Sequence, residues 1–167
     1  MWSRLRIVLL IVSLGILFGS QVALAKAPTR EPFIQEPVTF AAGEVCPFAL
    51  RLENVSGGQT LTAFANGDVL ITGASFTKVT NLDRGLSLIV NGSGPVSITP
   101  NANGTLTLKG TGRGLLFFFP GELGPGRPGA LLSTTGLVVE TLSADFTQVL
   151  SFSHQQGTTE DLCQTLR

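Results

Sequence analysis

Apolar and polar residues alternate over short stretches of this chain. Residues 105–109 alternate Leu with Thr and Lys, and residues 96–99 alternate Val and Ile with Ser and Thr. A period of two turns successive side chains to opposite faces of a strand, so that one face is buried and the other meets water. The pattern is typical of antiparallel sheets.

Between Cys46 and Ser153, turn signals separate such stretches at intervals of about 8–12 residues, which is the spacing of β-sandwiches and barrels. The expected strands cover residues 48–53, 60–65, 69–72, 76–82, 86–90, 96–99, 105–109, 115–119, 131–133, 137–142 and 148–153. Asn66-Gly67 is the sharpest hairpin signal, because both residues accept positive φ. We therefore expect a single all-β domain of about ten short antiparallel strands. Short turns favour an up-and-down barrel, and a two-layer sandwich is the alternative.

The segment before this domain has a different composition. Residues 26–44 contain Pro28, Pro32 and Pro37 among scattered apolar side chains. Prolines at this density block a helix and favour extended backbone. We expect an extended arm over 26–44, with its later part packed on the β domain of residues 45–167.

The C-terminal residues predict a short helix. Thr158 or Thr159 can cap it, Glu160 and Asp161 then lie in its first turn, and Arg167 lies at its end. Acidic residues at the start and a basic residue at the end of a helix complement its dipole. This is the one helix that the pattern predicts after the first 25 residues.

Residues 1–25 have the order of a secretory signal peptide. Arg4 and Arg6 precede an apolar stretch from Ile7 to Phe18, and small residues follow up to Ala25. This order predicts cleavage before Lys26 and a protein that is secreted, with no membrane segment after cleavage. An uncleaved membrane anchor is the alternative, but the apolar stretch is short for a span of about 20 residues.

Only two cysteines are present, Cys46 and Cys163, near the two ends of the β domain. In an oxidising compartment an even pair is most simply a disulfide. A zinc site usually takes four ligands, and the chain has a single histidine, so we expect neither a metal nor a cofactor.

Composition narrows the function. Cleavage after residue 25 leaves nine basic and eleven acidic residues, a net charge of −2, which gives no reason to expect a nucleic-acid partner. The same cleavage removes the only tryptophan, and the chain has no tyrosine. Sugar-binding surfaces and protein hot spots rely on those two side chains, so both classes are disfavoured. A pocket lined by aliphatic residues and phenylalanine stays open as a binding site.

The run at residues 115–119 breaks the alternation. Leu115, Phe117 and Phe119 share one face of the expected strand, and Leu116 and Phe118 share the other. An exposed apolar face often marks a ligand or partner surface, which makes Phe117, Phe118 and Phe119 candidate ligand contacts. The favoured alternative is that the N-terminal arm or the C-terminal helix covers the outer pair.

His154 is the only histidine and follows the last expected strand of the series. It is a further candidate for ligand contact, and Glu140, Asp145 or Asp161 could serve as its partner in acid–base chemistry. No nucleophile elbow or paired-carboxylate motif accompanies it, so an ordinary structural histidine is the favoured interpretation and the catalytic residues stay unknown.

Five strings of the chain carry a family likeness: Val45-Cys-Pro-Phe48, Asn66-Gly-Asp-Val-Leu-Ile-Thr-Gly73, Val79-Thr-Asn-Leu82, Gly114 to Gly121, and Asp161-Leu-Cys163. With them, most of residues 40–167 resembles small secreted proteins encoded in genomes of actinobacteria and related bacteria. The resemblance implies an exported bacterial protein and carries over no catalytic residue.

Two kinds of function fit these observations. We expect a secreted binding or structural extracellular protein rather than an enzyme. The alternatives are a small β-barrel enzyme of the cyclase or isomerase type and a carrier of a small apolar ligand. An apolar pocket of about 300 Å³ or more that contains His154 or a buried carboxylate would favour the enzyme, whereas a filled barrel would exclude both alternatives.

Overall fold

The structure is a computed structural model that describes residues 26–167, so the predicted signal peptide lies outside the described residues. Its elements are β1 (Thr29–Phe33), β2 (Val38–Phe40), β3 (Leu50–Ala63), β4 (Val69–Asn81), β5 (Ser87–Asn91), β6 (Val96–Pro100), β7 (Leu106–Phe118), β8 (Ala130–Leu142), β9 (Val149–Gln155), β10 (Thr159–Asp161) and α1 (Leu162–Thr165). Within this part of the chain, no helix is long and apolar enough to cross a membrane.

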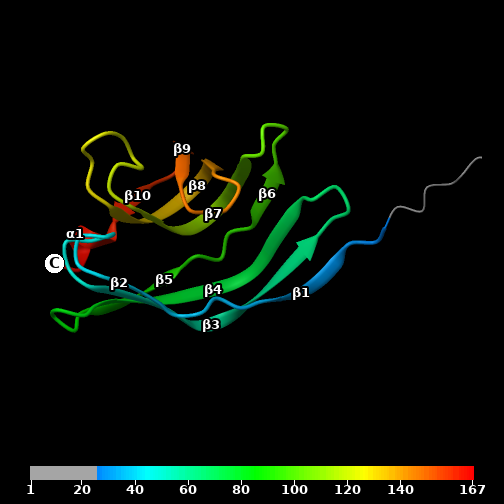
Figure 1. Cartoon of the computed structure of the whole chain (residues 1–167). Coiled ribbons are helices and arrows are strands. Elements are labelled where there is room, and N and C mark those ends of the chain that lie inside the picture. Colours follow the sequence, from blue (N-terminus) through cyan, green and yellow to red (C-terminus); the bar gives the residue numbers. More distant parts are fainter. Residues whose placement is uncertain (1–25) are drawn as a thin grey trace, which may run out of the picture.

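All ten strands belong to one antiparallel sheet that folds over into two layers (Figure 1). In one layer, β1 and β2 share an edge of β3, and β3 pairs with β4. The far edge of β4 is shared by β5 and β6, and β6 leads into the second layer of β7 and β8. There β9 and β10 share the last edge.

The expected all-β fold with a short C-terminal helix is confirmed, whereas the barrel is wrong. A barrel would require β1 or β2 to pair with β9 or β10, and no such pairing occurs among the described residues. The two terminal edges of the sheet instead lie in different layers. The molecule is therefore an open two-layer sandwich.

Four strands are longer than the sequence predicts, because glycines in the gaps between the expected strands lie inside them. Gly73 stands in mid-β4 with φ +124°, and Gly112 on β7 faces Gly136 on β8, with φ +81° and +100°. A Cβ atom would meet the carbonyl oxygen of Gly58 at Gly73 and that of Gln156 at Gly136. Glycine thus bends these strands without ending them, as it does at bulges and kinks.

The proline-containing segment is extended and joins the sheet. β1 pairs with the second half of β3, β2 pairs with its start, and Phe40 at the end of β2 is buried. Both strands lie at an edge, where a proline removes no ladder hydrogen bond that a neighbour needs.

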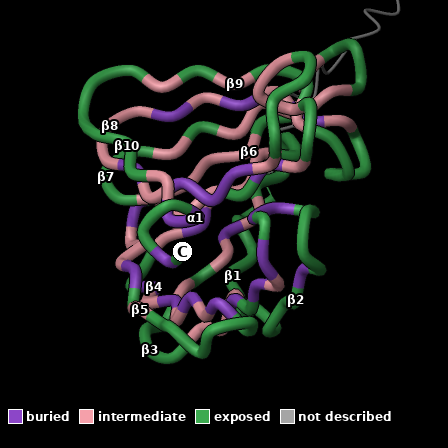
Figure 2. Tube along the Cα trace, turned by 90° about the vertical axis from the view of Figure 1, so that its left-hand side faces the viewer, coloured by how far each residue is buried: buried purple, intermediate pink, exposed green. Residues whose placement is uncertain are grey.

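The main core lies at the end of the sandwich that holds α1. Figure 2 shows buried stretches of both layers around this helix. The buried residues of this core are Phe40, Val45, Cys46, Phe48, Leu50, Leu52, Val79, Val90, Leu131, Leu162, Cys163 and Leu166. They come from both layers and from α1, so the helix fills the space between the layers at this end.

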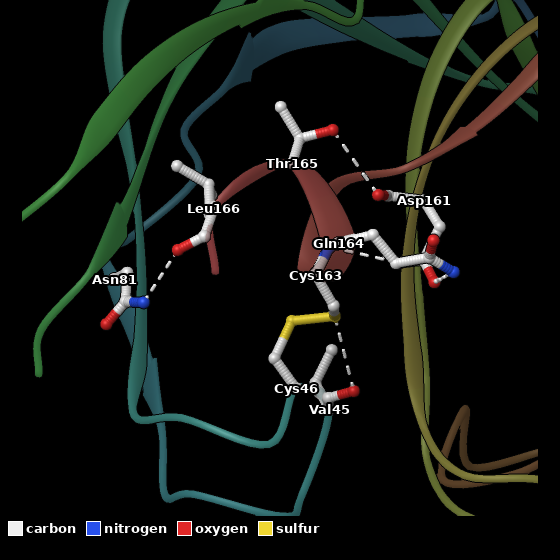
Figure 3. The surroundings of a disulfide bond; sticks show 8 residues. All are labelled: Val45, Cys46, Asn81, Asp161, Cys163, Gln164, Thr165 and Leu166. Carbon is white, nitrogen blue, oxygen red and sulfur yellow. Dashed lines mark hydrogen bonds between the residues drawn. A yellow bond between two sulfur atoms is a disulfide. The ribbon is translucent and has the colours of Figure 1, made fainter. Parts of the chain in front are cut away.

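The predicted disulfide is confirmed: Cys46, before β3, is bonded to Cys163 on α1, with 5.3 Å between their Cα atoms (Figure 3). Asn81 at the end of β4 is buried and donates from Nδ2 to the carbonyl oxygen of Leu166 at 2.8 Å. The C-terminus is thereby tied to the first layer by one covalent bond and one buried hydrogen bond.

The predicted helix cap is wrong. Thr159–Asp161 forms β10 on β8 instead of the first turn of the helix, and Asp161 caps α1 by accepting from the backbone N–H of Cys163 at 3.0 Å. Pairing with an available strand edge satisfies the backbone of residues 159–161, so the helix is left with a single turn.

We expect loss of the disulfide to lower the free energy of unfolding by about 4–5 kcal/mol, because the bond closes a long loop in the unfolded chain. Urea unfolding of the Cys46→Ser, Cys163→Ser double variant should show this loss, and the reduced wild-type protein should match it. An unfolding midpoint equal to that of the oxidised protein would contradict the role given to this bond.

Candidate functional site

Away from the main core, the space between the layers is not filled. Three neighbouring hollows of about 130, 290 and 230 Å³ lie along β7 and all have Leu115 in their walls. We call them the inner, middle and outer hollow, and together they form the groove along β7. The inner and middle hollows have residues of both layers in their walls, whereas the outer hollow is lined by residues of the second layer and its loops alone. Pockets of small-molecule size occur in such clefts.

Small side chains leave the inner hollow empty. Six glycines from the β5–β6 connection, β7 and β8 line it, together with aliphatic residues such as Ile71 and Val138. A glycine offers no side chain to fill the gap between layers. The residues that bend the sheet therefore also leave space inside it.

The middle hollow has one polar and one apolar wall. Ser75 and Thr77 on β4 line it from the first layer, and Leu115 and Phe117 on β7 line it from the second. Val38 lines it at the strand edge of β2. The hollow is thus reached from the side where the two terminal edges of the sheet do not pair.

Aromatic side chains connect the groove to the core. The ring of buried Phe40 lies 5.0 Å from that of Phe117 and 6.0 Å from that of Phe119, and the last two rings are 5.9 Å apart. Such tilted and edge-on contacts are favoured between phenyl rings. Phe117 is 43 % exposed although it packs against this cluster, so its free face is turned to the groove.

The outer hollow contains a buried carboxyl group. Glu140 on β8 is only 6 % exposed and its side chain makes no hydrogen bond among the described residues, but its carboxyl oxygens keep some contact with solvent in the hollow. Leu108 and Phe152 are its cross-strand neighbours on β7 and β9. Burial, and secondarily the charge of Glu122, raises the pKa of Glu140 to about 7.

Glu122, in the loop after β7, has a structural task of its own. Its two carboxylate oxygens accept from the backbone N–H groups of Phe119 at 2.7 Å and Val149 at 2.8 Å. These bonds tie the end of β7 to the start of β9 across the outer hollow. They also place a second carboxylate close to Glu140.

The structure separates the candidate residues of the phenylalanine run. Phe117 and Phe119 line the groove, whereas Phe118 is fully buried in a second core cluster with Ala130 and Leu132. Its ring lies 4.9 Å from that of Phe152 on β9, and Leu123 of the loop after β7 packs on the same cluster. Phe118 is therefore covered by β9 and this loop rather than by the N-terminal arm or α1.

His154 lies outside the groove. Its Nε2 is 2.7 Å from the carbonyl oxygen of Thr135, and its Nδ1 is 3.2 Å from the hydroxyl of Thr159. None of the three carboxylates considered as its partners is hydrogen-bonded to it. The imidazole thus connects β8, β9 and β10.

Sequence reasoning considered Glu140 only as one possible partner of His154 and not as a site residue in its own right, although a signal existed. In residues 137–142 it alternates in step with Val138 and Leu142, which places a carboxyl group on the apolar face of its strand. A charged residue on such a face is unusual unless it has a partner or a function.

No protein-family model matches the chain, and neither a curated protein nor a solved structure is found to match it. Among residues 26–167 no group of three or more His, Cys, Asp and Glu side chains could hold a metal ion. The candidate site is the groove, with the apolar side chains of β7 in its wall and the carboxyl group of Glu140 in the outer hollow.

We expect Glu140→Gln to stabilise the protein above neutral pH. The raised pKa means that the folded state holds the proton more tightly than the unfolded state does. The resulting stabilisation is present below the ordinary pKa of glutamate and is lost as the pH rises through about 7. A neutral amide avoids this loss, so the variant should gain up to about 3 kcal/mol over wild type at alkaline pH and little at acid pH.

Urea unfolding of the wild type and the variant at several pH values from acid to alkaline measures the difference between their free energies of unfolding. Contributions of other titrating groups are the same in both proteins and cancel in this difference. Glu31→Gln, at an exposed position on β1, is the matched control. A wild-type-to-variant difference that stays constant with pH would show that Glu140 does not titrate as described.

Proposed function

We propose that the protein binds a small apolar molecule in the groove along β7 and acts as an extracellular binding protein or carrier. The observation that carries the proposal is the half-exposed ring of Phe117 between the middle and outer hollows. Water in contact with this ring and with Leu115 is unfavourable, and a ligand that displaces it gains the corresponding burial energy.

The form of the groove supports a small ligand rather than a protein partner. The middle and outer hollows, at about 290 and 230 Å³, are near the lower limit of small-molecule pockets. Their walls are strands of one hydrogen-bonded sheet, so the site exists before binding and little ordering entropy is lost. Two further phenylalanines, Phe119 and Phe146, border the outer hollow.

One observation favours the alternative of a small enzyme. The outer hollow holds a buried carboxyl group whose pKa of about 7 suits acid–base chemistry near neutral pH. The second carboxylate of the hollow, Glu122, already accepts hydrogen bonds from two backbone N–H groups, so it does not form an acid–base pair with Glu140. Binding therefore remains the preferred function. A bound compound whose mass and nuclear magnetic resonance spectrum are both unchanged after incubation supports binding, and a converted compound, including an isomer of the same mass, supports catalysis.

Secretion is part of the proposal. The disulfide between Cys46 and Cys163 is of the kind that persists in oxidising compartments. The sequence before Lys26 has the order of a secretory signal peptide.

We expect Phe117→Ala to weaken the binding of the apolar dye N-phenylnaphthylamine about tenfold, because the dye loses its largest apolar contact in the groove. Dye fluorescence measures this directly, since residues 26–167 contain no tryptophan or tyrosine. Ile89→Ala is the control, because Ile89 on β5 is 64 % exposed but does not line the groove. Equal loss in both variants, or no dye binding by the wild type, would contradict binding in the groove.

We expect the exported protein to begin at Lys26. Production of the full chain in a bacterial host, followed by N-terminal sequencing of the protein recovered outside the cytoplasm, tests this. Protein that still begins at Met1, or that stays in the cytoplasm, would refute the export pathway.

A further inference from the structure

The outer hollow combines three features whose joint effect goes beyond the binding of a neutral apolar molecule. It contains a buried carboxyl group without a hydrogen-bond partner, a second carboxylate beside it, and phenyl rings in its wall. We propose, on the basis of the proposed function, that the ligand of this groove is an organic cation whose ammonium group binds at Glu140 and whose apolar body lies against Phe117 and Phe119.

The charges around Glu140 favour a cation. The loop after β7 contributes the carboxylate of Glu122, whose charge acts on Glu140. β7 and β9 place Leu108 and Phe152 beside Glu140, and none of the residues that line the outer hollow is Lys, Arg or His.

Basic groups near this region point elsewhere or have other partners. On β7, Lys109 is exposed and does not line the outer hollow. On β9, His154 has the same parity as Phe152 but is hydrogen-bonded to Thr135 and Thr159. Arg113 lines the inner hollow rather than the outer one. No basic group of the described chain is therefore paired with Glu140.

An ammonium group would satisfy Glu140. A carboxylate in an apolar hollow is costly without a partner, and a cation that arrives with the ligand supplies both the opposite charge and the hydrogen-bond donors. The faces of Phe117 and Phe119 attract a cation further through their π electrons. A ligand carboxylate would instead be repelled by Glu122 and by ionised Glu140.

The same geometry makes cation binding depend on pH. At low pH Glu140 carries a proton and offers no negative charge to the ammonium group. Because its pKa is about 7 in the free protein, the affinity for the cation should rise as the pH passes through neutrality. The affinity for a neutral ligand of the same shape should not follow this rise.

Three ligands with one apolar body test the inference: phenylbutylamine, phenylbutanol and phenylbutyrate, titrated calorimetrically into residues 26–167 with the disulfide intact. At alkaline pH we expect the amine to bind at least about tenfold more tightly than the alcohol, and the carboxylate to bind most weakly. At acid pH the preference for the amine should shrink. Glu140→Gln should abolish the preference for the amine over the alcohol.

Two further variants test whether the preference for the amine depends on these particular side chains. Glu31→Gln changes the net charge by the same amount away from the groove and should preserve the preference for the amine. Phe117→Leu keeps an apolar wall but removes the ring, and should weaken the amine about threefold relative to the alcohol.

The outcomes separate this inference from the proposed function. If the alcohol and the apolar dye bind but the amine binds no more tightly, the organic cation is wrong and the apolar binding site stands. A preference for the amine that persists in Glu140→Gln also overturns the inference. If neither the dye nor any of the three ligands binds, the proposed function fails and the cation with it.

Discussion

The architecture depends on how two sheet layers are held together where their outer edges do not pair. At one end the disulfide between Cys46 and Cys163 and the apolar side chains of α1 join the layers. At the other end the sheet itself passes between them, because β4 pairs with β6. Without a closing ladder, the remaining side of the sandwich is free to be a groove. The constraint at the two ends keeps that groove from collapsing.

Filling of the interior changes along the groove. The core around α1 is packed with aliphatic side chains and Phe40, whereas glycines and the short polar residues Ser75 and Thr77 line the middle of the sandwich. Cavities and buried carboxyl groups cost stability, and Glu140 adds such a cost above neutral pH. A fold that keeps these features beside a disulfide fits a protein whose stability comes from one end and whose binding site occupies the rest.

Sequence alone predicts the strands, the paired cysteines and the extended N-terminal segment, because alternation, cysteine count and prolines are local signals. It misplaces strand ends at Gly73, Gly112 and Gly136, since a glycine that bends a strand looks the same in sequence as one that ends it. The helix cap is misplaced for a related reason: Thr159–Asp161 finds a distant strand edge. The groove cannot be predicted from the sequence, because the exposure of Phe117 depends on how distant strands are arranged around it and not on a local pattern.

The most direct test of the groove as the binding site is a map of contacts by nuclear magnetic resonance. Titration of isotopically labelled residues 26–167 with phenylbutanol should shift the signals of Leu108, Leu115, Phe117 and Glu140, which line the outer hollow. The signals of Ile89, on the outer face of β5, should stay unchanged. Shifts centred on Ile89, or spread evenly over both layers, would contradict the account.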